Sequence, residues 1–436
     1  MRPLNSLTLE TVRDRLSGVF RQIPDSRRGD VNYLLHDVLM TGFAMLYFQH
    51  PSLLRFQEQM KEKKGRCNLE TVFKVKTVPS DSQMREILDG VPIEYLRSLL
   101  PELFERMRRL GWTKEFVTSV GEQKDYTMLL DGSEYFHSTE IECPGCLGKA
   151  DKNGQINYSH QIVAATLVKA GTHQVLPLDV EEVRNTDGTE KQDCEINAGK
   201  RLIERVRQEH RQLALCAVGD ALYAHEPFVV DLRQKRMKFV LAVKEGSHKE
   251  TFEWVEELER MGECERGEWQ EGPAAKRHYF EYRIARQVPL KQDGEVLVDF
   301  LEVWVRDSKG NQIYHNSWVT DMELTRATVA TVFWLGRSRW KIENEQFNVQ
   351  KNHGYHLEHN YGHGNKTLSM VFYMLNLLAF VTHLILELGD RLYQECRLVG
   401  SRRGLWESLR GCFQFVLVES WAGLLQAILD NRQASP

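Results

Sequence analysis

The chain has 436 residues, a formal net charge of −4, 42% hydrophobic residues and 27% charged residues. These values are typical of a globular protein and exclude the disordered and fibrous classes. Domains usually run to about 100–200 residues, so we expect two to four of them. Proteins that bind nucleic acids are more often basic overall, so binding to DNA would have to depend on local positive charge.

The longest apolar stretch, residues 368–389, is interrupted by Ser369, Asn376 and His383. We therefore predict a buried helix there, because a membrane span needs roughly 20 apolar residues. The N-terminus has no apolar signal segment, and the eight cysteines favour reduced thiols. A cytoplasmic location with no membrane partner follows from these features.

Residues 1–118 have helical periodicity, clearest at 32–48 and 93–110, and we predict a helical domain there. Basic residues cluster on its polar stretches, and solvated helix faces are the plain explanation for them. The alternative is that this domain binds DNA, and its candidate contact residues are Arg27, Arg28, Lys61, Lys63 and Lys64.

From residue 125 the pattern changes to short apolar runs typical of strands. The predicted order is strand–strand–strand–helix–strand–helix–strand, over residues 125–136, 159–171, 173–181, 193–210, 213–220, 225–236 and 238–246. Alternating apolar residues then predict a β-rich insertion, and helical periodicity returns at 326–347. The predicted α/β organisation has these parts: a helical domain at 1–118, a core at 119–245 and 323–385, an insertion at 246–322 and a helical region at 386–436.

Two predicted strands end in an aspartate beside a small residue, in the stretches "LLDGS" and "VGDAL". Taken alone, Asp131 or Asp220 is more often a turn residue. At neighbouring strand ends, however, two carboxylates lie close enough to share a divalent cation, which relieves their repulsion. A third carboxylate from a nearby helix would complete a site for two Mg²⁺ ions, an arrangement that can clamp a phosphodiester.

With "YSHQIVAATLV", "DCEINAGKR" and "RWKIENEQFN", these stretches resemble the DDE transposases of bacterial insertion sequences. The similarity is to the subgroup whose ribonuclease H-like core is interrupted by a β-rich insertion. It implies cut-and-paste transposition by phosphodiester hydrolysis and strand transfer, with two Mg²⁺ or Mn²⁺ ions on three carboxylates. It also implies binding to terminal inverted repeats and target DNA, and a homodimer in the DNA complex of a nucleoid-associated bacterial protein. A metal-dependent nuclease without strand transfer and a catalytically silent, domesticated DNA-binding protein are the alternatives.

The family resemblance makes Asp131 and Asp220 the first two carboxylates, and the third must come from residues 338–347. The subgroup has the signature Tyr-x2-Arg-x3-Glu-x6-Lys, and Glu343 places Arg339 at its arginine position. The signature tyrosine and lysine then fall on Gly336 and Gln350, with Lys351 directly after. The alternative, Glu345, matches no signature position and lies about 200° away around a helix. We predict Glu343 as the third ligand.

Relatives with the full signature cut the second strand through a hairpin in which a base is flipped onto aromatic residues. By this resemblance we expect Trp318 to stack on the base, in preference to Trp304. Arg339 is expected to hold a phosphate, and Lys351 to replace the missing lysine.

Cys143 and Cys146 form a Cys-x2-Cys pair, half of a structural zinc site. His137, His160 and Cys194 are candidates for the remaining ligands, and two ordinary thiols are the alternative. Four further histidines lie in a polar, Gly-rich segment, for which we expect a loop or contacts to the DNA backbone: His353, His356, His359 and His363.

Overall fold

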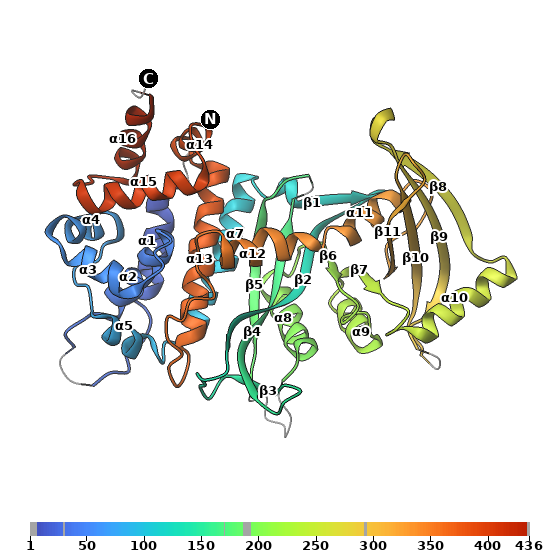
Figure 1. Ribbon diagram of the computed structural model, residues 1–436, viewed down its shortest axis with the longest axis horizontal. Helices are drawn as coiled ribbons and strands as arrows, with labels where there is room; N and C mark the ends of the chain where they lie inside the picture. The colour runs from blue at the N-terminus through green and yellow to red at the C-terminus, as the bar shows by residue number, and fades with distance from the viewer. Residues whose placement is uncertain (1–6, 29–30, 170, 186–192, 292–293, 434–436) are drawn as a thin grey trace.

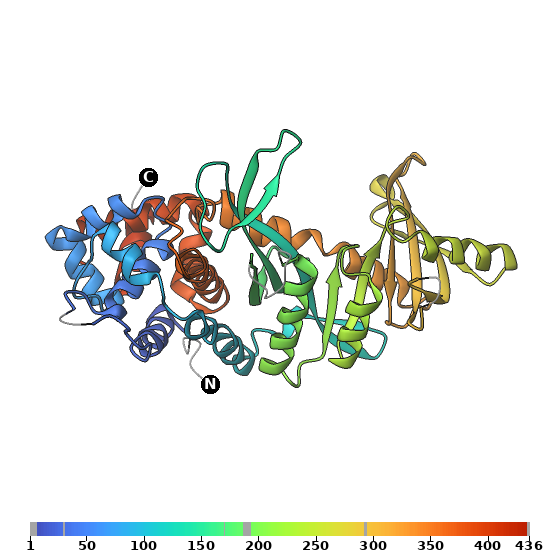
Figure 2. The same cartoon turned by 90° about the horizontal axis from the view of Figure 1, so that it is seen from below.

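The computed structural model describes residues 7–28, 31–169, 171–185, 193–291 and 294–433. These residues form a mixed α/β structure with helices gathered at one end and a long twisted sheet extending away from them (Figures 1 and 2).

The N-terminal part is helical, as predicted. Its helices are α1 (Leu9–Phe20), α2 (Leu35–Tyr47), α3 (Leu53–Lys61), α4 (Lys63–Phe73), α5 (Asp81–Leu88), α6 (Ile93–Arg97) and α7 (Leu99–Leu110), followed by the 3-10 turn η1 (Lys114–Phe116). Helix α5 begins at a capping box in which Ser80 and Gln83 satisfy each other's backbone N–H groups.

The C-terminal helices pack against this N-terminal part, so the two ends of the chain form one helical body (Figure 1). They are α13 (Leu368–Gly389), α14 (Arg391–Leu398), α15 (Arg402–Phe415) and α16 (Trp421–Gln433). Among the described residues, α13 is the one helix long and apolar enough to cross a membrane, but it is almost wholly buried by protein. The prediction of a buried helix at 368–389 is confirmed.

The sheet has eleven strands in the order β3-β4-β2-β6-β7-β11-β10-β9-β8, with β5 paired to β4 and β1 to β2. The first strands are β1 (Val117–Val120), β2 (Gln123–Ser138), β3 (Leu147–Ala150), β4 (Ile156–Val168), β5 (Val175–Val183), β6 (Leu215–Gly219) and β7 (Lys238–Val243). Strands β2, β4 and β5 are antiparallel neighbours, whereas β2, β6 and β7 run parallel. Helix α8 (Glu195–Glu209) connects β5 to β6, and helix α9 (Glu226–Gln234) is the crossover between the parallel strands β6 and β7.

The β-rich segment continues the core sheet, because β11 pairs with β7. Its strands are β8 (Glu265–Glu271), β9 (His278–Pro289), β10 (Leu297–Arg306) and β11 (Gln312–Thr320), with the 3-10 turn η2 (Ala274–Lys276). The segment opens with a helix, α10 (Lys249–Met261), where alternation alone predicted only strands.

The helical stretch expected at 326–347 is divided. Helix α11 (Val329–Arg337) ends before a turn, and a π-helix, η3 (Ile342–Phe347), leads into α12 (Asn348–Asn352). Single π-helical turns often occur at functional sites. The buried side chain of Gln346 accepts a hydrogen bond from Thr166 and so fixes η3 to β4.

Gly336 allows α11 to approach the sheet closely. A Cβ atom at this position would lie 2.4 Å from Nε1 of Trp318, whose indole is 1% exposed. The Trp318 ring therefore fills the space that a side chain at position 336 would need.

We expect Gly336→Ala to lower the free energy of unfolding by about 1–3 kcal/mol, because the indole on β11 cannot move without displacing its neighbours. Gly411→Ala in α15 is the matched control, since no atom lies within 4 Å of its Cβ position. The control should be neutral or gain about 0.4–1 kcal/mol. Urea unfolding of both variants measures the difference, and equal stability would show that the Trp318 contact is not tight.

Candidate active site

Asp131 lies within β2, and Asp220 directly follows the neighbouring parallel strand β6. The expectation that the first strand ends at Asp131 is wrong, because β2 continues to Ser138 in its pairing with β4. The ladder between β2 and β6 pairs Tyr126 with Leu215 and ends with Leu129 opposite Val218. Asp131 and Asp220 therefore both follow the end of this ladder, on strands about 4.8 Å apart. The structure thus brings the two aspartates together where the parallel pairing of β2 with β6 ends, and the charge of Asp220 acts on Asp131.

The π-helix adds a third carboxylate. It contacts β2 and β5, and the charge of Glu343 acts on Asp131. Glu345 acts on Lys341 instead, and both line a different, largely apolar cleft of about 780 Å³. The choice of Glu343 over Glu345 agrees with this placement.

The carboxyl group of Asp131 is the electrostatic centre of the cluster. Burial, partly offset by the Arg339 guanidinium, raises the pKa of Asp131 to about 7. Asp220, Glu195 and Glu343 raise this pKa as well. Nη1 of Arg339 donates a hydrogen bond of 2.7 Å to Oδ2 of Asp131. The cluster is thus rich in hard oxygen donors with too little positive charge, which suits Mg²⁺ or Mn²⁺.

Glu195 is a fourth carboxylate that the sequence reasoning missed. It is the first residue of α8, and it accepts a hydrogen bond of 2.8 Å from the hydroxyl of Tyr223. A Cβ atom on Gly132 would lie 2.5 Å from its carboxylate, so the glycine after Asp131 makes room for Glu195. Burial raises the pKa of Glu195. The sequence feature that could have identified Glu195 is its place in the first turn of a helix predicted to pack on the sheet.

One residue assigned by resemblance, Trp318, lies differently from expectation. Trp318 is buried against Gly336, which corrects the expectation that its ring stacks on DNA. Trp304 stacks on His315 with a centroid separation of 5.2 Å. The exposed tryptophans near the π-helix are Trp334 and Trp340, 46% and 44% exposed.

Gln350, which the resemblance places at the signature lysine position, is buried. Gln350 donates a hydrogen bond of 3.2 Å to Asn376 of α13 inside the protein. Lys351 is nearer the surface, and its ammonium lies 3.2 Å from Glu358. Lys351 is therefore placed to contact a ligand only by giving up this ion pair.

The predicted N-terminal basic residues do not form one free patch. Arg27 donates a hydrogen bond of 2.8 Å to Asp25, and Lys64 donates one of 2.9 Å to the carbonyl of Phe415. Arg28, Lys61 and Lys63 have exposed side chains.

A more concentrated basic surface lies where both ends of the chain meet the segment after α12. This basic cleft has a volume of about 710 Å³, and its charged and histidine lining residues are His50, Arg55, His353, His356, Arg402, Arg403, Glu407 and Arg410. Four arginines against one glutamate make it cationic. It combines residues distant in the sequence, so no local charge run revealed it.

Cys143 and Cys146 lie in the turn between β2 and β3, and the structure places His160 of β4 beside them. The other two candidate partners are elsewhere: His137 is 3.3 Å from Glu134, and Cys194 is the exposed N-cap of α8. His363 lies in a segment without helix or strand, as the expectation of a loop predicted, and it completes the group. A hydrogen bond from the Cys146 thiol lowers the pKa of the Cys143 thiol.

We expect Asp131→Asn to raise the free energy of unfolding by about 1 kcal/mol at pH 8 without divalent ions. The folded-state pKa of Asp131 lies above its unfolded value, so its ionised form costs stability at this pH. Mn²⁺ should then stabilise the wild type more than the variant, because the ion binds the native carboxylates. Glu345→Gln, the control, should respond to Mn²⁺ like the wild type. Thermal unfolding with and without Mn²⁺ measures both effects. If Asp131→Asn is less stable than the wild type without Mn²⁺, the ionised Asp131 does not destabilise the fold, and the argument from its raised pKa is wrong.

Comparison of the sequence with protein-family models and with curated proteins gives no match. A functional assignment for this chain therefore has to come from the geometry and chemistry of the site itself.

Proposed function

We propose that this protein is a DNA transposase that cuts and joins phosphodiesters with a ribonuclease H-like core. One observation carries the proposal: the carboxylates of Asp220 and Glu343 converge on the buried carboxyl group of Asp131. The three residues come from β2, the end of β6 and the π-helix. Each of these residues comes from a sequence stretch that resembles the DDE transposases.

The topology supports this core. Along the chain, β2, β4, β5, α8, β6, α9 and β7 follow one another in the order expected from the sequence, with the short strand β3 added after β2. In the sheet these strands lie in the order β5-β4-β2-β6-β7. Asp220 directly follows the carboxyl end of β6, and Asp131 lies beside it on β2, just past the end of the parallel β2–β6 ladder. Open α/β sheets usually bind ligands at the carboxyl ends of their parallel strands. Strands β8–β11 are then the insertion, which extends the sheet beyond β7.

The residues present fit two Mg²⁺ or Mn²⁺ ions. Asp131, Asp220 and Glu343 would coordinate these ions, and Glu195 lies close by. When bound, such ions activate the attacking oxygen and stabilise the leaving oxygen of a phosphodiester. Arg339 contributes a guanidinium beside these carboxylates, and a DNA phosphate would compete with Asp131 for it. Arg339 is therefore proposed to position the scissile strand.

The basic cleft and the exposed residues Arg28, Lys61 and Lys63 are proposed to bind the DNA backbone of transposon ends. The cleft includes Asn352 and His353, at the end of the segment that carries Glu343. DNA held in the cleft would continue towards the carboxylates along this segment. A homodimer in the DNA complex is part of the proposal, because two transposon ends have to be joined to one target.

We expect Asp131→Asn, Asp220→Asn and Glu343→Gln each to reduce cleavage of end DNA by at least about a hundredfold, because each removes a carboxylate ligand. Affinity for the same DNA should change little, since positioning depends on phosphate contacts elsewhere. Glu345→Gln is the matched control on the same π-helix and should cleave normally.

Gel assays with end-labelled DNA and Mg²⁺ measure cleavage, and a supercoiled target in the same reaction measures strand transfer. Cleavage without joining would favour the nuclease alternative. DNA binding without any metal-dependent cleavage would favour the silent DNA-binding protein. Normal cleavage by Glu343→Gln together with an inactive Glu345→Gln would move the third ligand to Glu345.

We expect the double variant Arg55→Gln, Arg403→Gln to bind DNA more weakly and with a shallower salt dependence. Each lost phosphate contact reduces the slope of log affinity against log salt by about 0.9. Arg391→Gln is the matched control, because Arg391 and Arg403 both pair with a glutamate four residues on, yet Arg391 lies outside the cleft. Fluorescence anisotropy at several salt concentrations gives the slopes, and an unchanged slope in the double variant would place the DNA on another surface.

A further inference from the structure

Four soft metal-ligating side chains converge away from the carboxylates. Cys143 and Cys146 come from the β2–β3 turn, His160 from β4, and His363 from the segment between α12 and α13. Their ligand atoms all lie within 4.8 Å of one another. Three separate segments therefore aim sulfur and nitrogen atoms at one point.

Four of the six distances among these ligand atoms are close to those of a tetrahedral zinc site. Nε2 of His160 lies 3.2 Å from Sγ of Cys143 and 3.4 Å from Sγ of Cys146, and the two sulfurs are 3.6 Å apart. Nδ1 of His363 lies 3.2 Å from Nε2 of His160. Zn–S bonds of about 2.3 Å and Zn–N bonds of about 2.0–2.1 Å at tetrahedral angles give edges of roughly 3.3–3.8 Å. A disulfide is excluded by the separation of the sulfurs.

Hydrogen bonding among the side chains cannot account for the same arrangement. Nε2 of His160 faces three heavy atoms at contact distance, from Cys143, Cys146 and His363. An imidazole nitrogen either donates one hydrogen or accepts with one lone pair, so two of these contacts would have no hydrogen bond. One central cation in contact with all four ligand atoms satisfies every one of them.

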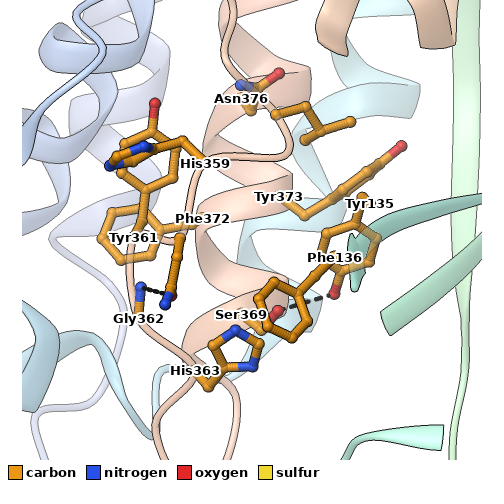
Figure 3. A pocket seen from close by; sticks show the side chains of 12 residues that line it. Tyr135, Phe136, His359, Tyr361, Gly362, His363, Ser369, Phe372, Tyr373 and Asn376 are labelled. Carbon is orange, nitrogen blue, oxygen red and sulfur yellow. Dashed lines mark hydrogen bonds between the residues drawn. The ribbon is translucent and has the colours of Figure 1, made fainter. Parts of the chain in front are cut away.

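The surroundings are those of a closed, structural site. His160 and Cys146 are buried, and the backbone N–H of Cys143 donates to Sγ of Cys146 over 3.3 Å. The ring of Phe136 lies 3.8 Å, centre to centre, from that of His363, and Figure 3 shows the two side by side. Nδ1 of His160 is buried without a hydrogen bond and lies 3.7 Å from Glu182, a carboxylate well placed to orient a ligating imidazole.

We propose that Cys143, Cys146, His160 and His363 bind one structural Zn²⁺ ion. Four protein ligands leave no open position, so the ion fixes structure and activates no water. The two thiols lose their protons to solvent on binding. The ion joins β4 to a residue 203 positions later in the chain and so anchors the segment that follows Glu343 to the β2–β4 hairpin.

Metal analysis of the full-length protein, purified without chelators and dialysed exhaustively, should find about one zinc per chain. Cys143→Ser and His363→Ala should each lose this zinc. His359→Ala, from the same segment, and Cys194→Ser are matched controls and should retain it. These variants separate the four proposed ligands from nearby residues of the same types.

Replacement by Co²⁺ gives a readout independent of DNA cleavage. The wild type should show the visible bands of tetrahedral Co²⁺ and thiolate-to-cobalt charge transfer, and His363→Ala should lose this pattern. If a ligand variant fails to fold, the wild type itself supplies the test, because chelation should lower its melting temperature and Zn²⁺ should restore it. Folded wild-type protein that lacks zinc and takes up Co²⁺ without thiolate bands would overturn the proposal. That result would leave the carboxylate site unaffected.

Discussion

The parallel pairing of β2 with β6 is the constraint on which the site depends. Its register ends just before Asp131 and Asp220, so the sheet's own hydrogen bonds set the separation of the two carboxylates. Apolar strands on both sides bury Asp131, and that burial is the largest cause of its pKa of about 7. The backbone ladder thus fixes a charge arrangement that is unfavourable by itself and favourable with a cation present.

The segment from α11 to α12 meets that edge of the sheet because small and polar residues anchor it. Gly336 lets α11 approach Trp318, and Gln346 ties the π-helix to Thr166. Between these anchors, the turn and the π-helix present Arg339 and Glu343 to the aspartates. The extension of the sheet through β11 supplies Trp318, so strands β8–β11 help to position the segment that carries Glu343.

Local sequence patterns were sufficient for most helices outside the β-rich segment, for the main core strands and for the choice of the two aspartates, because periodicity is a local property. They missed α10, the division of 326–347 and the continuation of β2 past Asp131. The signature spacing also favoured Glu343. The roles of Glu195, His363 and the basic cleft were not predicted, because the residues that they contact are distant in the chain. Glu195, for example, lies against Gly132 only because α8 packs on the sheet. Trp318 was misassigned for a similar reason, since its burial depends on a glycine in another element.

The two proposed metal sites differ in chemistry but share a chain segment. Carboxylate oxygens select hard ions at Asp131, whereas thiolates and imidazoles select zinc at Cys143, so exchange of metals between the sites is disfavoured. Glu343 begins the segment that His363 ends, and His353 of the basic cleft lies between them. A zinc ion at the far end would therefore limit the movement of the whole segment. Its effect on the carboxylates would pass through the backbone that joins the two sites. A metal site whose ligands must be placed closely needs rigid support of this kind.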